Sequence, residues 1–154
     1  VEFTYQNGQV VASQCRHQKG CMNRVEEVFQ GTRGNVITNS SHFGLIKNKR
    51  GKVVYNHEGE DDINPYQQEH NELFSAIKAG DYRMDDTNRG AEATMSAILG
   101  RMATYSGQKI TWDEAMAFDH KLVPELHSFN DNAPVQPDKE GNYPIPVPGV
   151  STYR

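Results

Sequence analysis

Two pairs of residues in this chain have side chains that could bind or transform a small polar molecule. Arg16 and His17 close an expected strand just before a glycine-containing loop, where a guanidinium can hold the hydroxyl or carboxylate groups of a ligand. Glu69 and His70 are neighbours in an expected helix, and the imidazole could transfer protons. We assign no catalytic residue.

Each candidate also has a plainer interpretation. The first pair can be the end of a strand that carries two exposed polar groups. His70 falls on the apolar side of its helix, where a hydrogen-bonded core histidine is common. Arg101, Trp112 and Glu114 are better explained by helix packing and capping than by a site.

The sequence lacks the motifs of the common cofactor and catalytic sites. No G-x-G-x-x-G follows an expected strand, and Gly31-Thr32-Arg33-Gly34 is typical of a turn. Neither a G-x-S-x-G elbow nor H-E-x-x-H occurs. Cys15, His17 and Cys21 could be imagined as metal ligands, yet no fourth ligand follows at finger-like spacing. We therefore expect free thiols, no bound metal and no cofactor held by this chain.

Composition limits the partners that we expect. The formal net charge of −4 argues against nucleic acid, and the basic cluster Lys47-Asn48-Lys49-Arg50 is typical of a solvated hairpin tip. The acidic run Glu58, Glu60, Asp61 and Asp62 reads as a solvated linker. No apolar run approaches the roughly 20 residues that cross a bilayer, so we expect no membrane partner.

The chain opens in the middle of an extended pattern at Val1, which suggests a fragment of a longer protein. No signal peptide is visible. Since an export signal would lie before Val1, the compartment stays open, with the cytoplasm as the default.

The first part of the chain, about residues 1–56, reads as strands. Asn7-Gly8 predicts a type I′ hairpin that pairs Tyr5 with Val10 and Phe3 with Ala12. Short connections between the later strands predict a largely antiparallel sheet. The expected later strands are Val10–His17, Arg24–Gln30, Asn35–Thr38, Gly44–Lys47 and Lys52–Asn56.

Over about residues 64–120, the spacing of apolar residues changes from that of strands to that of helices. Asn64 is a good N-cap, Pro65 suits the first helical position, and Gln67 fits a capping box. Gly80 should end this first helix. Its apolar stripe, which we expect to be buried, consists of Tyr66, His70, Leu73, Phe74 and Ile77.

A second helix should run from Asp86 or Thr87 to Tyr105, with Gly107 as its cap. It carries one large apolar stripe and one stripe of small residues that permits close packing around Gly100. The small stripe is Ala93, Ala97, Gly100 and Thr104, and the large one Ala91, Met95, Ile98, Leu99 and Met102. A short third helix should start at the capping box Thr111-Trp112-Asp113-Glu114 and end near Phe118 or His120, with Ile110 as a hydrophobic staple.

Residues 1–129 thus form one expected α+β domain, an open sheet with helices packed on one face, followed by a proline-rich tail over residues 130–154. Tyr143, Ile145 and Val147 alternate with prolines, and we expect the tail to be draped over the domain. The other face of the sheet then needs a cover. Val11, Val25 and Phe29 suggest a homodimer through that face.

Several segments, in this order, resemble the C-terminal domain of the glucose–fructose oxidoreductase / inositol dehydrogenase / MocA (Gfo/Idh/MocA) family. The likeness runs from Val1 to about Phe118 and includes the strand pair that ends in Cys15-Arg16-His17 and the Gly-Thr-Arg-Gly turn. The specific segments are Asn64-Pro65-Tyr66-Gln67-Gln68-Glu69-His70, Gly100-Arg101-Met102-Ala103-Thr104-Tyr105-Ser106-Gly107 and Trp112-Asp113-Glu114.

The resemblance implies an NAD(P)-dependent oxidoreductase, mostly acting on sugars or polyols, of which this chain is the substrate-binding and oligomerisation domain. The family's glycine-rich fingerprint, its Glu-Lys-Pro segment and its Asp-x-x-x-His pair do not occur here. NAD or NADP would then bind elsewhere in the parent protein. By this analogy Arg16, His17, Tyr66 and His70 contact a sugar-like substrate, and fold analogy does not identify that substrate.

Two other functions fit the same sequence. The chain could be a non-catalytic oligomerisation or ligand-binding module that keeps the family's sheet. It could also belong to a relative that uses a tightly held NAD for elimination-type glycoside cleavage.

Overall fold

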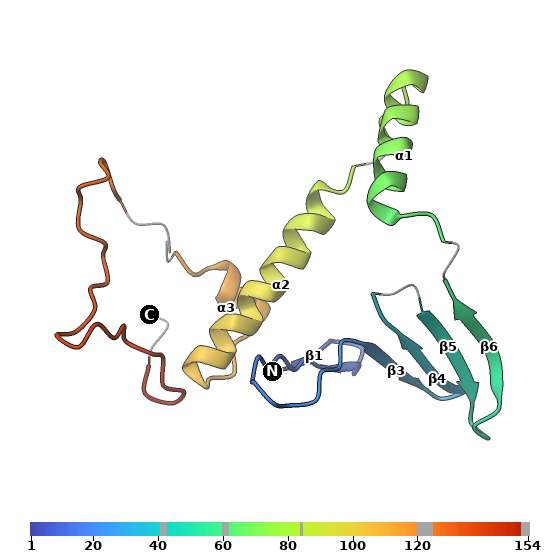
Figure 1. Ribbon diagram of the computed structural model, residues 1–154, viewed down its shortest axis with the longest axis horizontal. Coiled ribbons are helices and arrows are strands. Elements are labelled where there is room, and N and C mark those ends of the chain that lie inside the picture. The colour runs from blue at the N-terminus through green and yellow to red at the C-terminus, as the bar shows by residue number, and fades with distance from the viewer. Residues whose placement is uncertain (41–42, 60–61, 84, 120–124, 152–154) are drawn as a thin grey trace. The chain divides into compact units, whose positions relative to one another are not determined.

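The computed structural model describes residues 1–40, 43–59, 62–83, 85–119 and 125–151 (Figure 1). Over these residues it contains a four-stranded antiparallel sheet, a two-stranded sheet and three helices, which agrees with the expected α+β class. The chain divides into two compact units, His17–Met84 and the pair of segments Val1–Arg16 and Asp85–Arg154. The expected boundary between residues 129 and 130 stays a prediction.

Strands β1 (Glu2–Thr4) and β2 (Val10–Ala12) form the expected hairpin with a different turn. Phe3 pairs with Val11 instead of Ala12, so the predicted register was wrong by one residue. The backbone N–H of Gly8 donates to the carbonyl of Tyr5 at 2.9 Å, and Gly8 has φ 80°. This pattern is a three-residue loop with a glycine bulge, which adds one residue to the expected turn.

Helix α2 (Thr87–Ser106) and helix α3 (Trp112–Met116) share a small core. Leu99, Met102 and Ala115 are buried there, at 9%, 4% and 3% exposed. Met95, Ile110 and Phe118 pack against them. The expected punctuation is confirmed: Gly107 caps α2 in the left-handed conformation, and Thr111 with Glu114 forms the capping box of α3.

The glycine in the small stripe of α2 has a close neighbour, but it is an aromatic side chain and not the neighbouring backbone that the stripe predicts. Gly100 is buried, and a Cβ added to it would lie 2.8 Å from Cζ of Phe3 in β1. A side chain at this position would therefore collide with the aromatic ring. The rest of the stripe, at Ala93, Ala97 and Thr104, is exposed.

The proline-rich tail touches its unit at the end of α2. The backbone N–H of Gly149 donates to the carbonyl of Ser106 at 2.8 Å, and Pro148 lies against Gly107. The side chains expected to hold the tail are instead exposed: Tyr143 at 60%, Ile145 at 83% and Val147 at 52%. The draped tail is therefore correct at Gly149 and wrong for these three residues, because alternating prolines keep that stretch extended and without sheet partners.

The larger sheet has strands in the order β3 (Glu27–Gly31), β4 (Gly34–Thr38), β5 (Phe43–Asn48) and β6 (Val53–Glu58). All three pairings are antiparallel, as expected from the short connections. Val25 precedes β3, and Val11 belongs to the separate hairpin. The three residues expected to share an interface face, Val11, Val25 and Phe29, therefore do not lie on one sheet.

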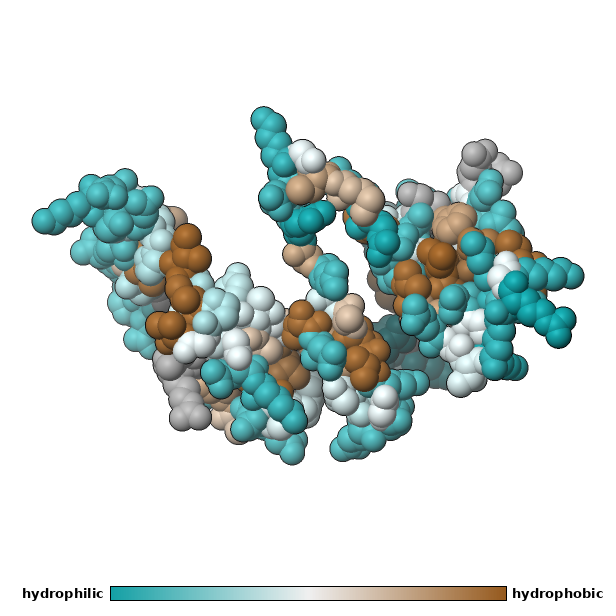
Figure 2. Space-filling model, turned by 90° about the horizontal axis from the view of Figure 1, so that it is seen from below, coloured by the Kyte–Doolittle hydropathy of each residue, from teal (hydrophilic) through white to brown (hydrophobic). Residues whose placement is uncertain are grey.

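The strand register assigns apolar residues to both faces of the β3–β6 sheet, because directly paired residues point to the same side. None of these residues is fully buried, and brown apolar patches reach the surface in Figure 2. A sheet of this kind needs cover on both sides. One face, here named the Val28 face, carries Val28, Ile37, Phe43 and Leu45; the other, the Phe29 face, carries Phe29, Val36, Ile46 and Tyr55.

Helix α1 (Pro65–Ala79) begins and ends where the sequence predicts, at Asn64 and at a left-handed Gly80. The expected capping box is wrong: the Asn64 side chain accepts from the N–H of Tyr66, and the Gln67 side chain donates to Asn71.

The expected buried stripe of α1 is also wrong, since no residue of this helix is buried. Its apolar members Tyr66, Leu73, Phe74 and Ile77 are 75%, 51%, 57% and 54% exposed. The caps and i, i+4 hydrogen bonds form the helix locally, whereas burial requires a second surface that the described residues do not supply.

Candidate functional site

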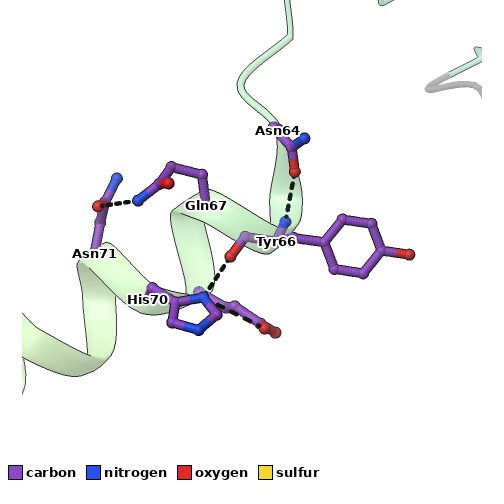
Figure 3. Close-up of polar contacts among 6 residues, drawn as sticks. Asn64, Tyr66, Gln67, His70 and Asn71 are labelled. Atoms are coloured by element: carbon purple, nitrogen blue, oxygen red, sulfur yellow. Dashed lines mark hydrogen bonds and ion pairs between the residues drawn. The ribbon is translucent and has the colours of Figure 1, made fainter.

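Tyr66 and His70 lie on the first turns of α1, held by local hydrogen bonds (Figure 3). Pro65 and the Asn64 cap fix the start of the helix, and the Asn64 Oδ1 accepts from the Tyr66 N–H at 2.9 Å. The His70 Nδ1 lies 2.6 Å from the Tyr66 carbonyl oxygen and 3.7 Å from Glu69 Oε1. Because a carbonyl oxygen can only accept, Nδ1 is the donor in the first contact, and Nε2 faces away from it.

The two candidate side chains of α1 point in different directions. The phenol ring of Tyr66 projects away from the imidazole of His70 in Figure 3, and both side chains are exposed. The pair therefore offers one aromatic face and one imidazole along an open helix surface. It can contact a polar ligand, but it does not enclose one.

The other candidate pair, Arg16 and His17, was expected at the end of a strand, and this prediction was wrong. Strand β2 stops at Ala12, so Arg16 and His17 lie beyond it in an irregular, exposed segment. The division between the two compact units falls between them. The structure thus brings Tyr66 and His70 within one helical turn, and the joining of all four residues into a cleft stays a prediction.

Sequence reasoning missed a histidine–carboxylate pair next to the sheet. The His57 Nε2 lies 2.7 Å from the Asp62 Oδ2, and the side chains are 41% and 39% exposed. The Tyr55 ring stacks on His57 with 6.4 Å between ring centroids. An Asp that fixes one ring nitrogen leaves the imidazole oriented for binding or proton transfer. The alternation Tyr55-x-His57 was the signal for this pair in the sequence. The pair was missed because Asp62 was interpreted as part of a solvated linker.

A groove of about 630 Å³ lies in the unit that contains α2 and α3. Met102, Ile110 and Phe118 give it an apolar floor. Its polar groups are partly engaged: the Ser106 hydroxyl donates to the Met102 carbonyl, and the Glu114 carboxylate accepts from the N–H of Thr111. The remaining lining residues are Gln108, Lys109, Ala117, Gly149, Val150 and Ser151.

No group of three or more potential metal ligands occurs among the residues that the structure describes. Cys15 is exposed and Cys21 is partly buried, and both are free thiols. No helix in the described ranges is long and apolar enough to span a membrane.

Among the described residues, the pKa values that depart from their ordinary range belong to four carboxyl groups in surface turns and to Arg83, whose pKa is raised by its hydrogen bond to Asp81. The Arg83 guanidinium lowers the pKa of Asp81, and hydrogen bonds from Thr87 lower the pKa of Asp85. The backbone N–H groups of neighbouring residues lower the pKa of Asp131 and of Asp138. These shifts stabilise turns and do not mark an acid–base site.

Comparison of the chain with protein-family models, with curated proteins and with solved structures found no match.

Proposed function

We propose that this chain is the C-terminal substrate-binding and oligomerisation domain of an NAD(P)-dependent oxidoreductase of the Gfo/Idh/MocA type, acting on a sugar or polyol. In this proposal the helices pack on one face of the open sheet, and a second copy covers the other face. The dinucleotide-binding domain belongs to another part of the parent protein.

The observation that carries the proposal is the agreement between the motif set and the ends of the helices. The segment that starts at Asn64-Pro65 opens α1, the segment that ends in Ser106-Gly107 closes α2, and Thr111 with Glu114 opens α3. The resemblance rests on the amino-acid identities in these segments. Each segment also has a physical role, because it caps the end of a helix. The uncovered apolar surfaces of the sheet and of α1 support the same proposal, because such surfaces are expected of a domain that works in an assembly.

The residues of this chain do not fit a dinucleotide. The glycine turn Gly31–Gly34 joins two antiparallel strands, whereas a pyrophosphate site needs a glycine turn that opens a helix. Hydride transfer would therefore take place on the parent protein's other domain. The role left for this chain is to bind hydroxyl groups, with Arg16, His17, Tyr66 and His70 as the proposed contacts.

NMR titration of the chain with a panel of hexoses and cyclic polyols tests the proposal. We expect millimolar binding that shifts the amide signals of α1 around Tyr66 and His70. NADH and NADPH should cause no shift, and the chain alone should reduce neither NAD nor NADP. Replacing His70 with Ala should weaken the response several-fold, while the matched change at His127, an exposed histidine of the other unit, should leave it unchanged.

Micromolar binding of NADH or turnover by this chain would contradict the domain assignment. A chain that self-associates but responds to no sugar or polyol would favour the non-catalytic oligomerisation module instead.

A further inference from the structure

The β3–β6 sheet carries opposite charges at its two ends. The β3–β4 turn and the β5–β6 turn lie side by side at one end, because the backbone N–H of Lys49 donates to the carbonyl of Arg33 at 3.2 Å. The sequence alone shows only the Lys47–Arg50 cluster, whereas the fold adds Arg33 from the neighbouring turn. This basic end consists of Arg33, Lys47, Lys49, Arg50 and Lys52.

The opposite end of the sheet is acidic. Strand β3 starts there after Glu26 with Glu27, and β6 ends there at Glu58. Glu26 is paired with Arg24 at 3.3 Å. The Glu58 carboxylate accepts a hydrogen bond from the Asn56 amide and forms no ion pair within the part of the chain that the structure describes.

The two ends cannot neutralise each other within one sheet. Glu58 pairs with Phe43 across the sheet, and Phe43 precedes Lys47 by four residues on β5. At about 3.3 Å per residue the two charged rows are about 13 Å apart, far beyond the reach of an ion pair. Among the described residues, none of the five cations at the basic end forms an ion pair. The five cations of the basic end and Glu58 at the acidic end are therefore available to a partner.

Only one face of the sheet carries both signs. On the Val28 face, Lys47 stands at the basic end and Glu58 at the acidic end, with Leu45 and Phe43 between them. The Phe29 face has Glu27 at its acidic end, while the residues of its strands at the other end are uncharged: Gly31, Gly34 and Asn48. The Val28 face is thus complementary to a copy of itself.

In the aligned class of sheet packing, a second copy can lie on this face in two ways. If the twofold axis is parallel to the strands, each basic end meets a basic end. If the axis is perpendicular to the strands, Lys47 of each copy faces Glu58 of the other and the apolar rows pack in the middle. In the first arrangement the basic ends of the two copies face each other, and repulsion between these like charges disfavours it.

We propose that two copies of this chain associate through their Val28 faces with antiparallel strands, Lys47 of one opposite Glu58 of the other. This rests on the proposed oligomerisation role and adds the face, the orientation and the residues that select it. The apolar centre, with Val28 at 46% exposed and Ile37, Phe43 and Leu45 half-buried, supplies the contact area. The charges determine the relative direction of the strands in the two copies.

Charge reversal, followed by sedimentation equilibrium of the whole chain at low salt, tests this inference. Lys47→Glu and Glu58→Lys should each weaken self-association by about tenfold or more, because each places two like-charged pairs in the dimer. An equimolar mixture of the two variants should associate about as tightly as the original chain, since the mixed dimer restores both pairs. The penalty of each variant should shrink in 0.5 M salt.

Glu27→Lys is the matched control, because it makes the same charge change at the same end of the sheet but on the Phe29 face. It should leave self-association unchanged. Dimers that form equally well with Lys47→Glu and with Glu58→Lys would overturn the orientation while leaving oligomerisation intact. An effect of Lys47→Glu without any effect of Glu58→Lys would also overturn it, because Lys47 would then face a group other than Glu58 in the partner copy. A monomer at all concentrations would overturn the oligomerisation role itself, independently of sugar binding.

Discussion

The unit that contains α2 and α3 and the unit that contains the larger sheet and α1 differ in how they treat their apolar side chains. In the first, Leu99, Met102 and Ala115 are buried together, and the returning tail reaches Ser106. In the second, both faces of the sheet and the stripe of α1 stay partly or largely exposed. Helices α1 and α2 nevertheless both end at a left-handed glycine cap, Gly80 and Gly107.

The comparison separates two sources of order. Caps and hydrogen-bonded turns form in both units because they need only neighbouring residues. A core forms only where a second element is held close, as the capping box and the short connection after Gly107 hold α3 against α2. The sheet unit has the first kind of order, and its apolar side chains stay partly or largely exposed. The predictions that follow test this difference, from the largest effect to the smallest.

The strongest test is a cavity in the core of the first unit. Met102→Ala should lower the free energy of unfolding by about 2–4 kcal/mol, because Met102 is 4% exposed and its removal leaves a cavity. Chemical denaturation followed by circular dichroism measures it. Met116→Ala is the matched control on α3, since Met116 is 59% exposed and should change stability little. Equal losses for the two methionines would contradict the assigned core.

Two glycine caps allow the units to be compared directly. Gly107 and Gly80 have φ of 68° and 67°, so alanine at either position meets the same left-handed strain of about 1–2 kcal/mol. At Gly107 the added Cβ would also lie 2.8 Å from the Gly149 nitrogen, whereas at Gly80 nothing lies within 4 Å. Gly107→Ala should therefore destabilise the chain by about 1 kcal/mol more than Gly80→Ala. Similar losses in denaturation would indicate that the tail contact is weak.

The N-caps of α3 and α1 should respond differently to truncation. Thr111→Ala removes the hydroxyl that accepts from the Glu114 N–H, and should cost about 1 kcal/mol. Thr111→Ser keeps that hydroxyl and should restore most of the loss. Asn64→Ala should have a different signature: because no residue of α1 is buried, it should lower helicity at 222 nm without shifting the unfolding midpoint of the α2–α3 core.

The smallest expected effect is a difference in how two carboxyl groups titrate. The pKa of Asp81 is lowered by the exposed guanidinium of Arg83, and that of Asp131 by the backbone N–H of His127. Since both pKa values are depressed in the folded chain, their stabilisation is present above the unfolded value and is lost as pH falls through the folded pKa.

Salt should change the pKa values of these two carboxyl groups by different amounts. An NMR titration should show the pKa of Asp81 rise toward its ordinary value as salt screens the ion pair, while the pKa of Asp131 moves less. Equal movement of the two pKa values would contradict the distinction between a guanidinium partner and backbone donors.

Local features of the fold could be predicted from the sequence, and long-range ones could not. Asn64, Gly80, Gly107 and Thr111 each stand at the helix end that their chemistry favours. The hairpin register failed by one residue, because Asn7-Gly8 fits both a two-residue turn and a three-residue loop with a glycine bulge.

The candidate site was harder to predict because it depends on contacts between distant residues. A helical stripe shows that a helix is amphipathic but not what covers it. The pattern therefore could not predict that Leu73 and Phe74 are exposed. The His57–Asp62 pair depends on how the chain turns after β6. The charged ends of the sheet likewise appear only when Arg33 and Lys49 are brought together by the strand order.

The bond between the Gly149 nitrogen and the Ser106 oxygen has a practical consequence for labelling experiments. A fluorophore on a cysteine placed at the exposed Val150 would sit beside the groove at the end of α2, although 44 positions separate it in sequence from Ser106. With Cys15 and Cys21 replaced by Ser, so that the label attaches only at position 150, its emission would report whether that end of the molecule is open or occupied.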